Sequence, residues 1–121
     1  MTRVKICGIT NCEDAKLACD FGADAIGLVF YQPSPRNVSI EKAVEIVHSL
    51  PPFTSNVALF VNETKENIDA VLNQVPIDII QFHGDESPEF CAFFSRPFIK
   101  AVRMKDGLDF NEIQHQYHNA R

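Results

Sequence analysis

Five short apolar runs that alternate with helix-like segments constrain the fold more than any other feature of this sequence. The runs cover residues 4–9, 25–30, 56–61, 77–82 and 98–102. Each is followed by a segment with helical periodicity or by a residue that can cap a helix. Strands that alternate with helices pair in parallel, because each helix returns the chain to the same end of the sheet. The pattern therefore predicts an α/β fold with a parallel sheet.

Capping residues and helix breakers predict where the five helices begin and end. The candidate N-caps are Asn11, Ser39, Thr64, Ser87 and Asp109. The first helix is expected to end at Phe21 before Gly22, and the last is expected to reach Arg121. No linker or low-complexity segment divides the five βα units. We therefore expect a single domain over residues 1–121.

Composition limits the classes of function. The chain has 121 residues, 45% of them apolar and 22% charged, with a formal net charge of −5. This charge argues against nucleic acid or an anionic membrane as the main partner, and no apolar run approaches the roughly 20 residues of a membrane span. The four cysteines lie in predicted strands and helices without CxxC spacing, which predicts reduced thiols in a cytoplasmic protein and no zinc site. A small anionic substrate is compatible with this balance.

Cys7 is the first candidate site residue, because it lies at the carboxyl end of the first predicted strand. In parallel α/β proteins, active sites and ligand-binding sites lie at that end of the sheet. Free cysteine is also among the most buried residue types, so a packing role is the simpler interpretation. A general base would need a thiolate, favoured by a nearby cation or helix amino terminus. Lys5 shares a strand face with Cys7 and could supply that cation or be a structural charge.

Three further polar residues follow predicted strands. Gln81 and His83 are two residues apart at the fourth strand end and are predicted to point to the same side. They are either a hydrogen-bonded pair that fixes the strand end or substrate contacts. Arg36, in a loop restricted by two prolines, could bind a carboxylate or be an ordinary surface arginine. Asp85 and Glu86 are interpreted as the solvated start of the fourth helix.

Several motifs in order resemble the phosphoribosylanthranilate isomerase family over essentially the whole chain. They are Lys5-Ile6-Cys7-Gly8-Ile9-Thr10, Gly22-Ala23-Asp24-Ala25-Ile26-Gly27 leading to Phe30-Tyr31, Ser34-Pro35-Arg36, Val57-Ala58-Leu59-Phe60-Val61-Asn62 and Gln81-Phe82-His83-Gly84. The resemblance implies a parallel (β/α)8 barrel of TIM type, of which these residues form about the first five βα units. A complete barrel of this type needs roughly 200 residues or more.

The resemblance also implies a reaction in tryptophan biosynthesis. The family converts N-(5'-phosphoribosyl)anthranilate to 1-(2-carboxyphenylamino)-1-deoxyribulose 5-phosphate by an Amadori rearrangement, with no metal or organic cofactor. By resemblance, Cys7 is the general base that removes the sugar C2′ proton, and Arg36 orients the anthranilate portion. Gln81 and His83 are similar to pocket-lining residues of the family. Its general acid, an aspartate after the sixth strand, and its phosphate-binding amides lie in regions without a counterpart in these 121 residues.

Two expectations follow for the 121-residue chain by itself. Without the general acid and phosphate anchor it is expected to be nearly inactive. An incomplete barrel leaves its first and fifth strands unpaired on one side, so self-association through these edges is expected. The alternative to an isomerase is a non-catalytic half-barrel that binds a partner chain or a phosphorylated metabolite. A different phosphosugar barrel enzyme is a weaker alternative, since many functions share this strand order.

Overall fold

The computed structural model describes residues 2–103 and 107–121 as five strands and five helices in strict alternation. The strands are β1 (Lys5–Cys7), β2 (Ala25–Phe30), β3 (Ser55–Phe60), β4 (Ile79–Phe82) and β5 (Phe98–Lys100). The helices are α1 (Cys12–Asp20), α2 (Ile40–His48), α3 (Lys65–Gln74), α4 (Pro88–Ala92) and α5 (Phe110–Gln116). This order confirms the five predicted βα units.

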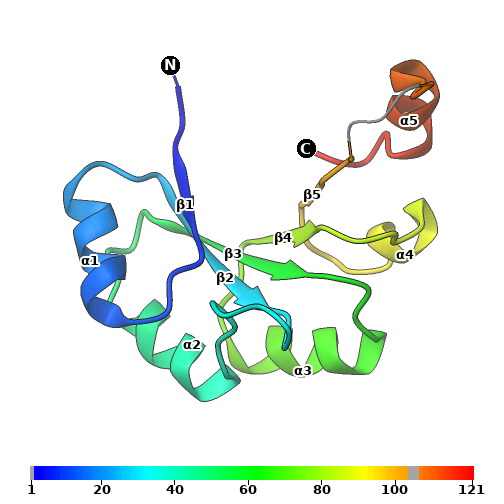
Figure 1. Ribbon diagram of the computed structural model, residues 1–121. Coiled ribbons are helices and arrows are strands. Elements are labelled where there is room, and N and C mark those ends of the chain that lie inside the picture. Colours follow the sequence, from blue (N-terminus) through cyan, green and yellow to red (C-terminus); the bar gives the residue numbers. More distant parts are fainter. Residues whose placement is uncertain (1, 104–106) are drawn as a thin grey trace.

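All neighbouring strands pair in parallel, in the order β1-β2-β3-β4-β5. Spatial order therefore equals chain order, which is the arrangement expected when each helix crosses over the same side of the sheet. Figure 1 shows α1, α2 and α3 following one another along one side of the strands, with α4 and α5 beyond them at the β5 end. Within the described residues, β1 and β5 are the two edges of an open sheet.

All five predicted N-caps are confirmed by a side chain that accepts a backbone hydrogen bond from the first turn. The bonds run from Asp14 to Asn11 (2.7 Å), from Lys42 to Ser39 (3.1 Å), from Asn67 to Thr64 (3.2 Å), from Phe90 to Ser87 (3.1 Å), and from Asn111 and Glu112 to Asp109 (3.0 and 3.2 Å). Because capping depends on local residues, helix starts follow directly from the sequence.

Strand and helix ends differ from the prediction where tertiary contacts decide them. β1 ends at Cys7, two residues early, because the amides of Gly8 and Ile9 both donate to the Gly27 carbonyl, at 3.0 and 3.1 Å. The last helix ends at Gln116, and the Arg121 amide then donates to the Phe98 carbonyl at 2.7 Å. The predicted helix over the last five residues is therefore wrong.

Alternate residues of each strand form two different faces. One face packs against the helices and contributes Ile26, Leu28, Phe60, Ile80 and Phe82, all 0–1% exposed, to the main core. The opposite face, which we call the inner face, carries Lys5, Cys7, Gly27, Val57 and Gln81. The inner face therefore holds three of the polar side chains that the sequence singled out, Lys5, Cys7 and Gln81.

Candidate functional site at the carboxyl ends of β1 and β4

Cys7 lies on the inner face at the carboxyl end of β1 and is half-buried. It pairs in register with Gly27 of β2. A Cβ atom at Gly27 would lie only 3.0 Å from the Cys7 sulfur and 3.1 Å from its Cα, so the missing side chain makes room for the thiol. The thiol is therefore accessible, in contrast to Cys91, which is fully buried.

Arg36 lies directly beside the residue that follows Cys7. A Cβ atom at Gly8 would lie 2.5 Å from both Cδ and Nη1 of Arg36, so the guanidinium packs against the Gly8 backbone. Two hydrogen bonds hold the loop: the Arg36 amide donates to Ser34 Oγ (3.1 Å), and the Val38 amide donates to the Val29 carbonyl (3.0 Å). The structure thus brings Arg36, which is exposed, to the same strand ends as Cys7.

Gln81 and His83 have different environments. Gln81 is half-buried, and its Oε1 accepts a hydrogen bond from the Lys5 ammonium, which reaches across the inner face from β1 to β4. His83 is exposed just beyond the strand, and its amide donates to the Phe60 carbonyl at 3.0 Å. The polar partner of Gln81 is therefore Lys5, a residue 76 positions away that sequence spacing did not connect to it.

Glu86 corrects the interpretation of Asp85 and Glu86 as a solvated helix start. Asp85 is exposed, but Glu86 is only 6% exposed and forms a buried ion pair with Lys100 at 3.1 Å. Its carboxylate also accepts the amides of Asn62 (2.8 Å) and Gly84 (2.9 Å). Burying a carboxylate is costly unless it is paired in this way.

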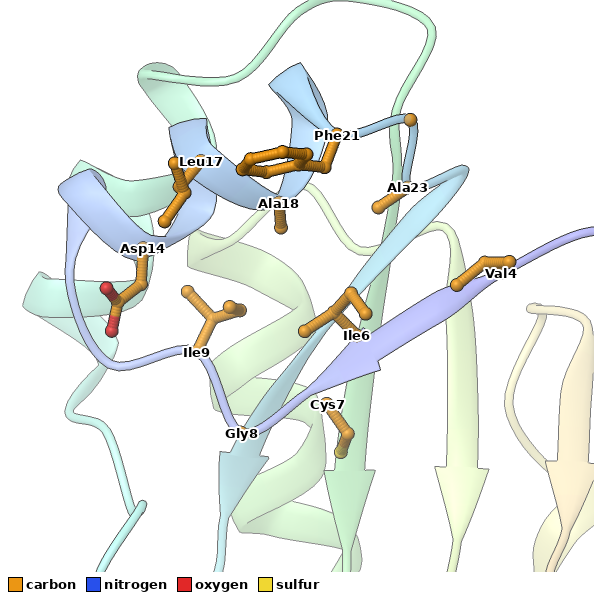
Figure 2. Close-up of a pocket in the computed structure, with 11 residues that line it drawn as sticks. Val4, Ile6, Cys7, Gly8, Ile9, Asp14, Leu17, Ala18, Phe21 and Ala23 are labelled. Carbon is orange, nitrogen blue, oxygen red and sulfur yellow. The ribbon is translucent and has the colours of Figure 1, made fainter.

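A separate apolar groove lies on the other side of β1, with a volume of about 480 Å³. Ile6, Leu17 and Phe21 line it and are 41%, 54% and 84% exposed. In Figure 2, Ile6 points toward α1 while the Cys7 side chain points away to the opposite side of the strand. The groove therefore adjoins the open edge of β1, and Cys7 is among its lining residues although its side chain points away from α1.

Two groups near β5 have altered acidity. Burial raises the pKa of the Cys91 thiol to about 11. Burial also raises the pKa of Tyr117, whose hydroxyl donates to the Glu86 carbonyl oxygen at 2.6 Å. Both groups therefore stay protonated at neutral pH.

Across residues 2–103 and 107–121, the His, Cys, Asp and Glu side chains form no cluster of three or more suited to a metal ion. In the same part of the chain, no helix has the length and apolar character of a membrane span.

The fold and the position of these side chains define the class of protein. Parallel βα units with functional residues at the carboxyl strand ends are typical of (β/α)-barrel enzymes. The model of the family described as N-(5'phosphoribosyl)anthranilate (PRA) isomerase matches residues 4–121. The chain belongs to the N-(5'-phosphoribosyl)anthranilate isomerase family.

Individual relatives agree with this assignment. The N-(5'-phosphoribosyl)anthranilate isomerase of Alcanivorax borkumensis is 58% identical over 98% of this chain, and that of Nitrosococcus oceani is 54% identical over 98%. These alignments cover 54% and 58% of the two relatives, so the chain spans little more than half of their length. The crystal structure of phosphoribosyl anthranilate isomerase from Thermotoga maritima matches with a TM-score of 0.89 at 44% identity, over 95% of this chain and 57% of that one. This match confirms the predicted TIM-type architecture.

Proposed function

We propose that the complete protein catalyses the isomerisation of N-(5'-phosphoribosyl)anthranilate to 1-(2-carboxyphenylamino)-1-deoxyribulose 5-phosphate in tryptophan biosynthesis. The observation that carries the proposal is the half-buried thiol of Cys7 at the end of β1, with the Arg36 guanidinium packed on the adjacent Gly8. A matching structure, with a TM-score of 0.89 and 44% identity, is a phosphoribosyl anthranilate isomerase in complex with reduced 1-(o-carboxyphenylamino)-1-deoxyribulose 5-phosphate. That ligand is a reduced form of the proposed product.

Cys7 is the proposed general base. Opening of the ribose ring gives a Schiff base whose cationic nitrogen makes the sugar C2′ proton more acidic. The Cys7 thiolate removes that proton, and the electron pair left on C2′ neutralises the nitrogen to give an enolamine. Protonation of C1′, with loss of the proton from the C2′ hydroxyl, then yields the ketose. Proton transfer of this kind is typically worth about 10²–10⁴ in rate.

The other three residues are proposed to bind and orient the substrate. The planar guanidinium of Arg36 suits the carboxylate of the anthranilate ring, which it can bind through two parallel hydrogen bonds. Gln81, held by Lys5, and the exposed His83 line the pocket from β4. The substrate is thus placed between β1 and β4, with Cys7 against the sugar carbon.

The free thiols of this chain fit a cytoplasmic location, which we also propose.

The test is the exchange of Cys7 for serine in the complete protein, with Cys12→Ser as the matched control. Cys7→Ser is expected to lower kcat by about 10²-fold or more while the melting temperature stays unchanged, because only the base is lost. Cys12, half-buried on α1, is expected to tolerate serine with wild-type turnover. A Cys7→Ser protein that keeps kcat within tenfold of wild type would reject Cys7 as the base.

The competing proposal is a non-catalytic half-barrel that binds a partner chain or a phosphorylated metabolite. The exposed apolar groove beside β1 favours this alternative, because large apolar patches mark interaction surfaces. The same assay separates the two: turnover by the complete wild-type protein supports the isomerase, and binding of substrate without turnover supports the binding module.

A further inference from the structure

The carboxylate of Glu86 joins the ends of three strands. Its Oε2 accepts the amide of Asn62 after β3 at 2.8 Å, and its Oε1 accepts the amide of Gly84 after β4 at 2.9 Å. The same Oε1 pairs with the ammonium of Lys100 on β5 at 3.1 Å. Glu86 and Lys100 have side chains only 2% and 7% exposed.

Each backbone amide of the segment that carries His83 donates a hydrogen bond, and Glu86 accepts the one from Gly84. The His83 amide donates to the Phe60 carbonyl at 3.0 Å, the Gly84 amide donates to Glu86, and the Asp85 amide donates to Asn62 Oδ1 at 2.8 Å. The Gly84 carbonyl in turn accepts a hydrogen bond from Lys100. Three consecutive residues at the mouth of the sheet therefore have no free backbone donor.

The packing around Gly84 leaves little room for another arrangement. A Cβ atom at Gly84 would lie 2.6 Å from Asn62 Oδ1 and 2.9 Å from the Asn62 nitrogen. Asn62 itself has a positive φ of 49°, a left-handed conformation that asparagine adopts more readily than most other residues with a side chain. The loops after β3 and β4 therefore lie in close contact, with no room for a side chain at Gly84.

Stability alone does not explain such a group. A buried ion pair is often no more stabilising than apolar side chains of the same volume, because both charges lose their hydration. The Glu86 carboxylate does impose a defined geometry, since its Oε2 binds the Asn62 amide and its Oε1 binds the Gly84 amide. This argument points to a geometric role for Glu86.

We infer that Glu86 is a positioning residue, which fixes the backbone of residues 83–85 and through it the His83 imidazole at the substrate pocket. The inference rests on the proposed function in taking His83 as a substrate contact. Glu86 itself lies beneath the loop, and it acts through the amides that it holds.

A double-mutant cycle in the complete protein tests this role, with Glu86→Gln, His83→Ala and both together. The control is Glu89→Gln, which removes an exposed carboxylate from α4, three residues further along the chain. Glu86→Gln is expected to lower kcat/KM by about tenfold or more, and to lower it by less than about threefold when His83 is already alanine. Amide hydrogen exchange of residues 83–85 is expected to accelerate at least about tenfold in Glu86→Gln and to stay unchanged in Glu89→Gln.

The possible failures are distinguishable. Unchanged exchange at residues 83–85, or an equal loss of kcat/KM in both His83 backgrounds, would overturn the positioning role while leaving the isomerase proposal intact. If His83→Ala has wild-type kinetics, the substrate contact of His83 fails, and with it the inference, even where exchange shows that Glu86 holds the loop. If Glu86→Gln does not fold, Glu86→Asp replaces it, because aspartate keeps the charge but its shorter side chain moves the carboxylate away from the Asn62 and Gly84 amides. The same kcat/KM cycle and the same hydrogen exchange of residues 83–85 then test the positioning role.

Discussion

Gly8 has two reasons to be glycine, and they can be separated by experiment. Its φ of +82° disfavours any side chain, and a Cβ atom would also meet Arg36 at 2.5 Å. Gly22 has a similar φ of +94° but open space around it. Alanine at either position is expected to cost about 1–3 kcal/mol in the free energy of unfolding. Because Arg36 is flexible, the contact at Gly8 is expected to displace the guanidinium and not to add much to that cost.

The measurement pairs urea unfolding with steady-state kinetics of the complete protein. Gly8→Ala is expected to raise KM for the phosphoribosylanthranilate substrate by about tenfold through lost orientation, whereas Gly22→Ala keeps the wild-type KM. A wild-type KM for Gly8→Ala would contradict the placement of Arg36 at the substrate. An equal rise in both variants would instead show that general destabilisation is responsible.

Individual residues differ in how far the sequence could predict them. Cys7 and Arg36 were predicted from strand ends and motif order; their roles stay a prediction, and the structure places Arg36 against Gly8, next to Cys7. Glu86 was missed because Asp85 and Glu86 are adjacent acids with the same local signal, and only tertiary packing buries one of them. The Lys5–Gln81 bond was missed for the same reason, since it joins β1 to β4.

At the scale of elements, prediction succeeded where the determinants are local. Capping residues and apolar periodicity gave all five helix starts, because both depend on neighbours a few residues away. The predicted end of β1 was wrong because hydrogen bonds to the Gly27 carbonyl, on the next strand, determine where β1 ends. The short α4 shows the same contrast: its Ser87 cap is local, whereas the burial of Cys91 depends on packing in the main core.

The burial of Cys91 in α4 predicts a loss of stability at high pH. Burial is the main cause that raises its pKa from 9.0 to about 11, with a smaller opposing effect of Lys100 and a smaller raising effect of Glu86. The unfolded chain ionises this thiol near pH 9, while the folded chain keeps it protonated. Its contribution to stability is therefore complete below pH 9 and is lost between pH 9 and 11. We expect a loss of about 2–3 kcal/mol across this range.

Urea unfolding of the wild type and of Cys91→Ala at pH 8, 9.5 and 10.5 tests whether stability falls as the pH rises. The variant is expected to be less stable at pH 8, because it leaves a cavity, but to lose less stability as the pH rises. Tyr117, whose pKa burial also raises, contributes in the same direction and remains in both proteins. Parallel pH dependences for the two proteins would show that the Cys91 thiol does not contribute.

At the scale of the whole molecule, the open sheet dominates the expected behaviour. Among residues 2–103 and 107–121, β1 and β5 each have one strand neighbour, and Ile6, Leu17 and Phe21 are exposed beside the β1 edge. Unpaired strand edges with adjacent apolar surface are templates for association with another chain. The chain also spans only 54% to 58% of the two compared relatives, and by resemblance the general acid and phosphate anchor belong to later strands.

A polypeptide of these 121 residues is therefore expected to self-associate and to show turnover at least about 10²-fold below that of the complete protein. Light scattering after size-exclusion chromatography measures the first property. Ile6→Lys is expected to shift the population toward monomer, because a charge then lies in the groove beside the β1 edge. Phe53→Lys is the control, since Phe53 is 99% exposed in the turn before β3 and is not among the residues that line that groove. A wild-type polypeptide that is monomeric at every concentration, or an equal response of both variants, would show that the β1 edge does not drive association.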